Sequence, residues 1–333
     1  MTNIEWTGQT LNPTTGCDRI SPGCDRCYAM TMAKRLKAMG QAKYQNDGDL
    51  TTSGPGFALT MHDDVIYEPL TWKKPRLVFV NSMSDLFHDK VDTDFIAKFF
   101  GVMALTPRCT YQILTKRHGR LRSLLNSGPF HTAVLAWAAR LQDDKHPMPS
   151  WNPAERRLTK WPLPNVHLGV SVENQKWADI RIPALIDTPA AIRFLSCEPL
   201  LGPVTLFPGD HSTHERDFNG TDDYTCLDCS NDEQHVPWRV IDRGNLGIDW
   251  VIIGGESGPG ARPFDPQWAT DLIDDARLAG ASPFVKQLGS VWARDTYVNG
   301  KSVAAHGDTK GGNPDYWPAH LRVREYPQEA ASV

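Results

Sequence analysis

Short apolar runs, each followed by polar or glycine-rich residues, recur along most of the chain. Continuous apolar runs of about four or five residues are typical of strands buried on both faces, as in a parallel sheet. An earlier strand is expected within residues 3–12. The clearest runs begin at Leu77, Tyr111, Val166, Ile192, Trp250 and Pro283.

Helical patterns separate these runs. Residues 28–39 and 93–105 carry apolar positions at helical spacing, and Asp265 before Pro266 is typical of the start of a third helix. Strand and helix alternate over about seven units, which is the pattern of an α/β fold. We therefore predict a complete or partial parallel β/α barrel, formed by one domain over residues 1–333.

Two segments interrupt this alternation. Residues 119–165 are helical at first and then rich in Pro and Trp, whereas residues 208–245 are polar throughout. The second segment contains Cys226 and Cys229, a pair spaced like half of a zinc site. We expect both segments to be insertions in the barrel. The cysteine pair in the second either binds zinc or stays reduced and unliganded.

The composition is that of a soluble globular enzyme, with 40% hydrophobic and 22% charged residues in a chain of 333. The formal net charge of -4 argues against binding nucleic acid through bulk charge, but it permits a local basic groove. No signal-peptide pattern opens the chain, and no stretch approaches the ~18 apolar residues of a membrane span. We expect a cytoplasmic protein with no membrane partner. The sequence does not indicate its oligomeric state.

Polar residues follow nearly every predicted strand. The carboxyl ends of parallel strands meet at one rim of a β/α barrel, and chemistry gathers there. The candidate site residues at this rim are Asn81, Ser84 and Asp85; Thr115 and Lys116; Ser171, Glu173 and Asn174; Ser196 and Glu198; Gly254, Gly255, Glu256 and Ser257; and Lys286 and Gln287.

Three cysteines follow the first predicted strand: Cys17, Cys24 and Cys27, spaced C-x6-C-x2-C. In a reducing compartment, close cysteines indicate a metal rather than disulfides. Thiolates at this spacing suit three irons of a [4Fe-4S] cluster, or a zinc ion with a distant His or Cys as its fourth ligand. Their place at the predicted rim favours the cluster, because a structural zinc more often lies away from the active rim.

Three close cysteines after the first strand of an α/β barrel resemble the radical S-adenosylmethionine (radical SAM) superfamily. The first gap is longer than in the superfamily's usual C-x3-C-x2-C, and Tyr28 follows the last cysteine instead of an aromatic residue preceding it. A closer resemblance, in order and over most of the chain, is to a phage and prophage protein family named for its three-cysteine motif. The segments that carry it are WTGQTLNPTTGC, SPGCDRCYA, VNSMSDLFH, SVEN, WVIIGGESGPGARP and KGGNPDYWP.

This resemblance implies a partial barrel of the radical SAM type, with a [4Fe-4S] cluster on Cys17, Cys24 and Cys27. It implies that the open iron binds S-adenosylmethionine (SAM), and that an electron from a reductant protein cleaves SAM to a radical that abstracts hydrogen. The phage association favours a nucleic-acid base or nucleotide as substrate, as in DNA modification or repair. The cofactor-binding candidates at the rim are Ser84, Asp85, Ser171, Glu173, Asn174, Gly254, Gly255, Glu256 and Ser257.

Cys197, Lys286 and Glu256 are the candidates for direct chemistry. Cys197 either donates hydrogen to a substrate radical or is a small apolar core residue. Lys286 would point a cation into the site. The basic stretch that begins at Lys116 either contacts phosphate or forms a solvated helix face.

Two other functions fit the sequence. One is a barrel stapled by zinc that binds nucleic acid or a partner protein without redox chemistry. The other, a metal-dependent hydrolase, is weaker, because the predicted strand ends lack a set of His ligands. Iron and sulfide in the purified protein, as opposed to zinc, would distinguish the first reading from the second.

Overall fold

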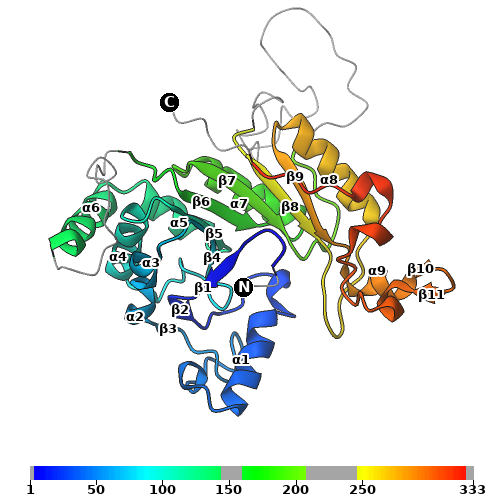
Figure 1. Cartoon of the computed structure of the whole chain (residues 1–333), viewed down its shortest axis with the longest axis horizontal. Coiled ribbons are helices and arrows are strands. Elements are labelled where there is room, and N and C mark those ends of the chain that lie inside the picture. The colour runs from blue at the N-terminus through cyan, green and yellow to red at the C-terminus, as the bar shows by residue number, and fades with distance from the viewer. Residues whose placement is uncertain (1–3, 144–159, 208–245, 328–333) are drawn as a thin grey trace, which may run out of the picture.

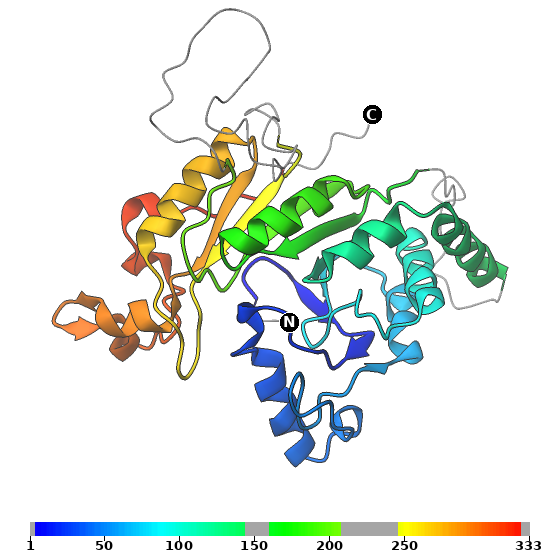
Figure 2. The ribbon, with the colours of Figure 1, turned by 180° about the vertical axis from the view of Figure 1, so that it is seen from behind.

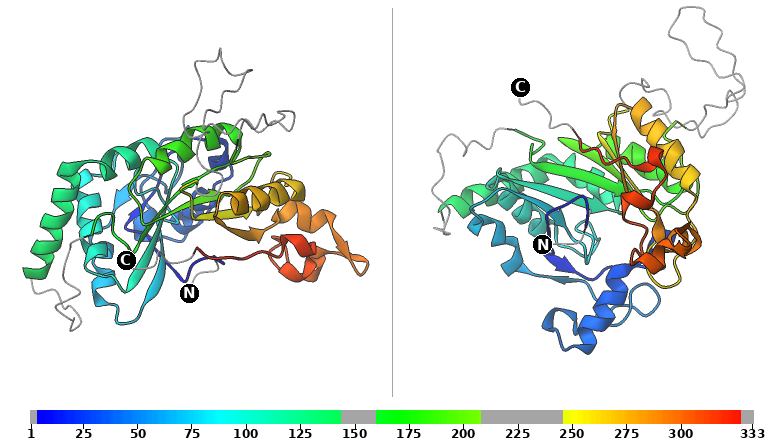
Figure 3. Two further views of the ribbon diagram at one scale, coloured as in Figure 1. Left: turned by 90° about the horizontal axis from the view of Figure 1, so that it is seen from above. Right: turned by 45° about the vertical axis from the view of Figure 1, so that its right-hand side comes forward.

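The computed structural model describes residues 4–143, 160–207 and 246–327. Its centre is a parallel sheet of seven strands that curls into a half-barrel, in the order β1-β4-β5-β6-β7-β8-β9 (Figures 1 and 3). These strands are β1 (Gln9–Leu11), β4 (Arg76–Val80), β5 (Cys109–Thr115), β6 (Val166–Ser171), β7 (Ile192–Cys197), β8 (Trp250–Gly254) and β9 (Ser282–Gln287).

Helices and short strands connect and flank the sheet. The helices are α1 (Tyr28–Ala38), α2 (Asp63–Ile66), α3 (Glu68–Thr71), α4 (Thr93–Ala104), α5 (His118–Leu125), α6 (Gly128–Asp143), α7 (Gln175–Ile186), α8 (Pro266–Leu278) and α9 (Gly289–Asp295). Two antiparallel pairs are β2 (Thr14–Thr15) with β3 (Thr60–Met61), and β10 (Tyr297–Val298) with β11 (Lys301–Ser302). Short 3-10 helices are η1 (Pro22–Cys24), η2 (Ala42–Tyr44), η5 (Val303–His306), η6 (Pro314–Tyr316) and η7 (Ala319–Leu321).

The outer face of the sheet is covered by helices, and Figure 2 shows α7 and α8 lying along it. Alternate residues of each strand point to this face, because side chains alternate along a strand. In β6 and β8 they include Leu168 and Val251, which belong to the main hydrophobic core. Helix α8 contributes buried residues at helical spacing, among them Leu272 and Ile273. This two-sided burial explains why the strands read as continuous apolar runs.

The inner face holds a separate aromatic cluster. Trp6, ahead of β1, packs against Phe79 of β4, Phe194 of β7 and Trp250 of β8, with ring centroids 4.7, 6.0 and 5.8 Å apart. Phe284 of β9 extends the cluster, with its ring 5.9 Å from that of Trp250. These rings fill the interior of the half-barrel below the carboxyl ends of the strands.

The six apolar runs of the sequence are all confirmed as strands of this sheet, and the strand expected within residues 3–12 is β1. The helices expected over residues 28–39 and 93–105 are α1 and α4. Asp265 begins α8 as expected, since its side chain accepts a hydrogen bond from the amide of Gln267 at 2.9 Å.

The first insertion, residues 119–165, contains most of α5, all of α6 and a stretch outside the described residues. The second, residues 208–245, lies outside the described residues, and so do Cys226 and Cys229. Among the helices that the structure describes, none has the length and apolar character needed to cross a membrane.

Candidate functional site

The carboxyl ends of β6 to β9 bring polar residues to the inner side of one rim. Ser171 of β6 lies beside Ser196 of β7 in the sheet register. Two residues further along, side-chain alternation brings the Glu173 and Glu198 carboxylates toward the same side. Lys286 of β9 completes this row, with its ammonium 3.0 Å from Glu198 Oε1.

The three cysteines lie on one loop, residues 16–27, which we call the cysteine loop. The loop follows β2 and ends at Cys27, the N-cap of α1. It passes from the β4 side of the rim toward the β6 and β8 sides, because its first residues contact residues 83–84 and its later residues contact Glu173 and Glu256. The thiols are therefore at the carboxyl ends of the strands, as the sequence predicts.

The start of the loop is fastened to the β4 side through its backbone. The Gly16 amide donates to the Met83 carbonyl at 3.0 Å, and the Ser84 hydroxyl donates to the Gly16 carbonyl at 2.6 Å. Gly16 has a φ of 86°, and a Cβ there would lie 2.1 Å from the Ala58 carbonyl oxygen. Only glycine fits this position without strain.

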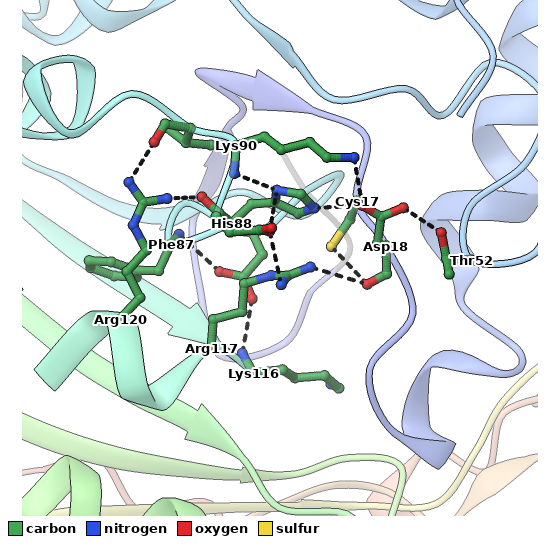
Figure 4. A network of polar contacts seen from close by, with 12 residues as sticks. Cys17, Asp18, Thr52, Phe87, His88, Lys90, Lys116, Arg117 and Arg120 are labelled. Carbon is green, nitrogen blue, oxygen red and sulfur yellow. Dashed lines mark hydrogen bonds and ion pairs between the residues drawn. The ribbon is translucent and has the colours of Figure 1, made fainter. Parts of the chain in front are cut away.

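A charged network surrounds Cys17 and Asp18 (Figure 4). The buried His88 ring lies with Nε2 3.0 Å from Asp18 Oδ2, and Arg117 Nη2 lies 3.5 Å from the Asp18 carbonyl oxygen. Burial and, to a smaller extent, the neighbouring Arg117 lower the pKa of His88. Asp18 also accepts from the Thr52 hydroxyl at 2.7 Å.

The middle of the loop rests on the buried Glu173. Its Oε1 accepts the Ser21 hydroxyl at 2.7 Å and lies 3.3 Å from the Lys116 ammonium. Its Oε2 accepts from Arg181 at 2.8 Å, and both of these side chains are fully buried. Glu173 keeps a pKa below the ordinary value of a glutamate although burial opposes this, because Lys116, Arg181 and the hydrogen bonds stabilise its charge.

A second carboxylate, Glu256 after β8, reaches the same loop through arginines. Arg262 forms a two-pronged pair with Glu256, at 2.6 and 3.0 Å, and donates to the Pro22 carbonyl at 3.0 Å. Arg26 of the loop approaches Glu256 at 3.7 Å. The loop is thus connected to both the β6 and the β8 sides of the rim.

The three thiols are free and half-buried. Burial is the main cause that raises the pKa of Cys17 to about 12, and the Asp85 carboxylate adds to it. Within the ranges that the structure describes, no three His, Cys, Asp or Glu side chains are placed to hold a metal ion. The donor chemistry of a three-thiol iron site is present on one loop, and because each thiol of a [4Fe-4S] site binds a different iron, the three need not surround a single ion.

Two arginines near the cysteine loop have buried nitrogens without hydrogen-bond partners. Arg117 Nε and Arg181 Nε and Nη2 are buried and have no hydrogen-bond partner. Burial raises the pKa of Cys17, and Arg117 opposes this shift. Burial lowers the pKa of Arg181, and Glu173 and, to a smaller extent, Cys24 oppose that shift. Such donors are costly to leave unpaired, and an anionic group on the thiolates would give them a charge to face. The surroundings of the loop therefore fit a negatively charged cluster.

The other predicted cofactor contacts have structural partners here. Asp85 accepts from the Thr115 hydroxyl at 2.7 Å and the Lys116 amide at 3.0 Å. Asn174 caps α7, accepting from the Trp177 amide at 3.3 Å. Ser171 is buried, and its carbonyl accepts from Arg181 at 2.8 Å.

Gly254, the last residue of β8, and Gly255 are tightly surrounded. A Cβ at Gly254 would lie 2.6 Å from Glu198 Oε1, and one at Gly255 would lie 2.6 Å from the Leu288 carbonyl oxygen. Gly255 therefore needs glycine for packing alone, because a side chain there would meet backbone, whereas a side chain at Gly254 would displace the Glu198 carboxylate. Ser257, the next polar residue after Glu256, is exposed.

Cys197 and Lys286 have different surroundings. Cys197 is fully buried in the core on the outer face, and burial raises the pKa of its thiol well above the ordinary value. This location fits the apolar-core alternative. Lys286 faces the inner side and pairs with Glu198.

The basic stretch after β5 contacts the protein itself. Lys116 reaches Glu173, Arg117 reaches Asp89 at 3.2 Å, and Arg120 donates to the carbonyl oxygens of residues 88 and 91. The first residues of the stretch are thus held by the protein, whereas Arg122, which belongs to the same stretch, is exposed on α5 as in a solvated helix face.

Sequence reasoning missed Ser21, Gly23 and Arg181, which together surround Glu173. The signal for Arg181 was an arginine in a helix that otherwise turns apolar residues to the core. Ser21 and Gly23 carried no signal, since serine and glycine are common in any loop.

Comparisons with known proteins give a family and no function. No curated protein and no solved structure matches the chain. Residues 1–317 match the profile of a family described as "Protein of unknown function (DUF5131)". Because this match spans nearly the whole sequence, the chain belongs to the DUF5131 family.

Proposed function

We propose that this protein is a radical SAM enzyme, and that its half-barrel is of the radical SAM type. Cys17, Cys24 and Cys27 would hold a [4Fe-4S] cluster. One observation carries the proposal: three free thiols share one loop that is fastened to the β4, β6 and β8 sides of the strand-end rim. A reducing cytoplasm suits these thiols, and a reductant protein would be the electron donor.

When bound, a cluster with one iron free of protein ligands binds SAM and supplies the electron that cleaves it to a hydrogen-abstracting radical. The residues of this chain would bind and orient the cluster and SAM, and they would exclude water from the site. The aromatic cluster around Trp6 closes the interior below the rim, so that water does not reach the site from that side. The proposed SAM contacts remain Ser84, Asp85, Ser171, Asn174, Gly254 and Gly255.

We further propose a nucleic acid or nucleotide as substrate. Residues 17–45 carry six cations and two carboxylates, a local excess of four positive charges in a chain whose formal net charge is -4. Lys34 and Arg35 are exposed on α1, and Tyr28, next to Cys27, is 62% exposed. A basic surface with an exposed aromatic ring suits a phosphate backbone and a stacked base. The cations lie on the segment that carries the thiols, which links substrate to cofactor.

Anaerobic purification tests the cofactor. We expect a brown protein that contains iron and sulfide and forms 5′-deoxyadenosine from SAM with a reductant. Cys24→Ala should abolish both the cluster and the product. Cys109→Ala is the matched control, since Cys109 lies in the outer core. A colourless protein with stoichiometric zinc at the cysteine loop would instead support the zinc-stapled barrel that binds nucleic acid or a partner protein.

Oligonucleotide binding tests the substrate class. Changing Lys34 and Arg35 together to Glu should weaken binding of single-stranded DNA or RNA. Loss of two phosphate contacts would flatten the dependence of log affinity on log salt by about 1.4. Lys73 and Lys74, both exposed before β4, changed to Glu give the same charge difference as a control. Equal weakening by both pairs would exclude a specific surface on α1.

A further inference from the structure

The contact between Glu173 and the cysteine loop is unusually close. Glu173 is the second residue beyond β6, and its Oε1 accepts the Ser21 hydroxyl at 2.7 Å. A Cβ built on Gly23 would lie 2.5 Å from Glu173 Cγ and 2.6 Å from Oε1. The loop backbone therefore lies directly on the carboxylate, and only a residue without a side chain fits there.

The Glu173 carboxylate is in turn held by two cations. Arg181 donates to Glu173 Oε2 at 2.8 Å and stacks on Trp177, with its guanidinium carbon 4.0 Å from the ring centroid. Lys116, at the end of β5, reaches Oε1 at 3.3 Å. Two cations from two elements thus fix the direction of one buried carboxylate, and side chains held in this way can orient a neighbouring group.

Glu173 contacts the part of the loop that lies between Cys17 and Cys24 in the sequence. Ser21 lies between Cys17 and Cys24, and the Cys24 amide donates to the Ser21 carbonyl at 2.9 Å. The Cys27 amide in turn donates to the Cys24 carbonyl at 3.2 Å. A change at Ser21 or Gly23 is therefore passed through the η1 turn to the second and third cysteines.

We propose that Glu173 is a positioning residue that locks the cysteine loop, through the Ser21 hydroxyl and against the Gly23 backbone, in the conformation that receives the cluster. The significance of this lock rests on the proposed function, but the lock itself does not require a bound cluster. It gives Glu173 a role toward the loop in place of a direct contact with SAM.

Hydrogen exchange on the cluster-free protein tests the lock. Ser21→Ala removes the hydrogen bond to Glu173 and the weaker 3.8 Å contact between the Ser21 hydroxyl and Cys24 Sγ. We expect amide exchange at Cys24, Asp25 and Cys27 to rise about threefold to tenfold. Gly23→Ala should raise it further. Gly202→Ala is the control, because a Cβ there would meet nothing within 4 Å. It should leave exchange in the loop unchanged.

A double variant separates positioning from general damage. Glu173→Asp shortens the side chain and keeps its charge, so it gives room to the methyl group of Gly23→Ala. We expect the double variant to exchange more slowly in the loop than Gly23→Ala alone. Additive effects of the two changes would overturn the proposed contact.

Iron and sulfide content after anaerobic reconstitution connects the lock to the cluster. Ser21→Ala and Gly23→Ala should each retain less iron than the wild type and Gly202→Ala. Unchanged loop exchange in both variants overturns the lock. Faster exchange with full iron retention overturns its role in receiving the cluster. Faster exchange in a protein whose wild type takes up no iron supports the lock and removes the proposed function instead.

Discussion

The two ends of the cysteine loop are held in different ways. Around Cys17 the loop is joined to its neighbours by backbone hydrogen bonds and by a network of charged residues that includes Asp18, His88 and Arg117. Around Cys24 it is held mainly by side chains from distant strand ends, Glu173 and Arg262. One end follows from hydrogen bonds of its backbone to residues 83–84 and from a charged network, and the other from Glu173 and from Arg262, which pairs with Glu256. The Cys24 end should therefore be the easier one to release by changing single side chains.

The largest effect is expected from removing Glu173. Glu173→Ala leaves Arg181 and Lys116 without their carboxylate, and Arg181 is fully buried. Breaking a buried ion pair from one side costs about 3–5 kcal/mol. Denaturant unfolding should show this loss in the free energy of unfolding. Glu198→Ala is the control. Its partner Lys286 is partly exposed, so this variant should lose less free energy of unfolding. Equal losses of stability in the two variants would contradict the idea that the fully buried ion pair contributes more than the partly exposed one.

The Cys17 end should instead be destabilised by a substitution that strains the backbone. Gly16→Ala puts a side chain at a φ of 86° and against the Ala58 carbonyl oxygen, and we expect a loss of about 2–4 kcal/mol. Gly40→Ala shares the left-handed backbone, at a φ of 74°, but meets nothing within 4 Å. The difference between the two unfolding free energies isolates the contact with Ala58. If both variants lose the same amount, the close approach does not matter.

Acid should lower the stability of the sheet that carries both ends of the loop. Burial lowers the pKa of His167 on β6 to about 4, from an ordinary value of 6.5. Between these values the unfolded chain binds a proton that the folded protein does not, so stability falls as the pH drops below about 6.5. From pH 7 to 5 this histidine should cost about 1–2 kcal/mol. His167→Asn should reduce the slope of stability against pH, and His320→Asn, at an exposed position, is the control for the substitution itself.

The smallest effect concerns the exposed edge of the Cys24 end. Asp25 lies 3.7 Å from Arg262 and its side chain is 59% exposed. Asp25→Asn should change the free energy of unfolding by less than about 0.5 kcal/mol, since exposed ion pairs contribute little. A larger loss would show that this end depends on the whole charged set and not on Glu173 and Glu256 alone.

Much of the fold could be read from the sequence. The strands at Leu77, Val166 and Trp250 were readable because burial on both faces leaves a continuous apolar run. The rim was readable because polar residues follow these runs. What could not be read is which rim residues face one another, since Ser21 and Glu173 are 152 positions apart and Pro22 and Arg262 are 240.

The sequence by itself determined the alternation of strand and helix and the presence of three thiols after the first strand. These follow from local rules: side-chain period and spacing along the chain. The tertiary structure alone decided that Glu173 and Glu256 meet the cysteine loop and that Cys197 turns into the outer core. The physical reason is that sheet register and curl choose the partners of a buried charge, and no local pattern records that choice.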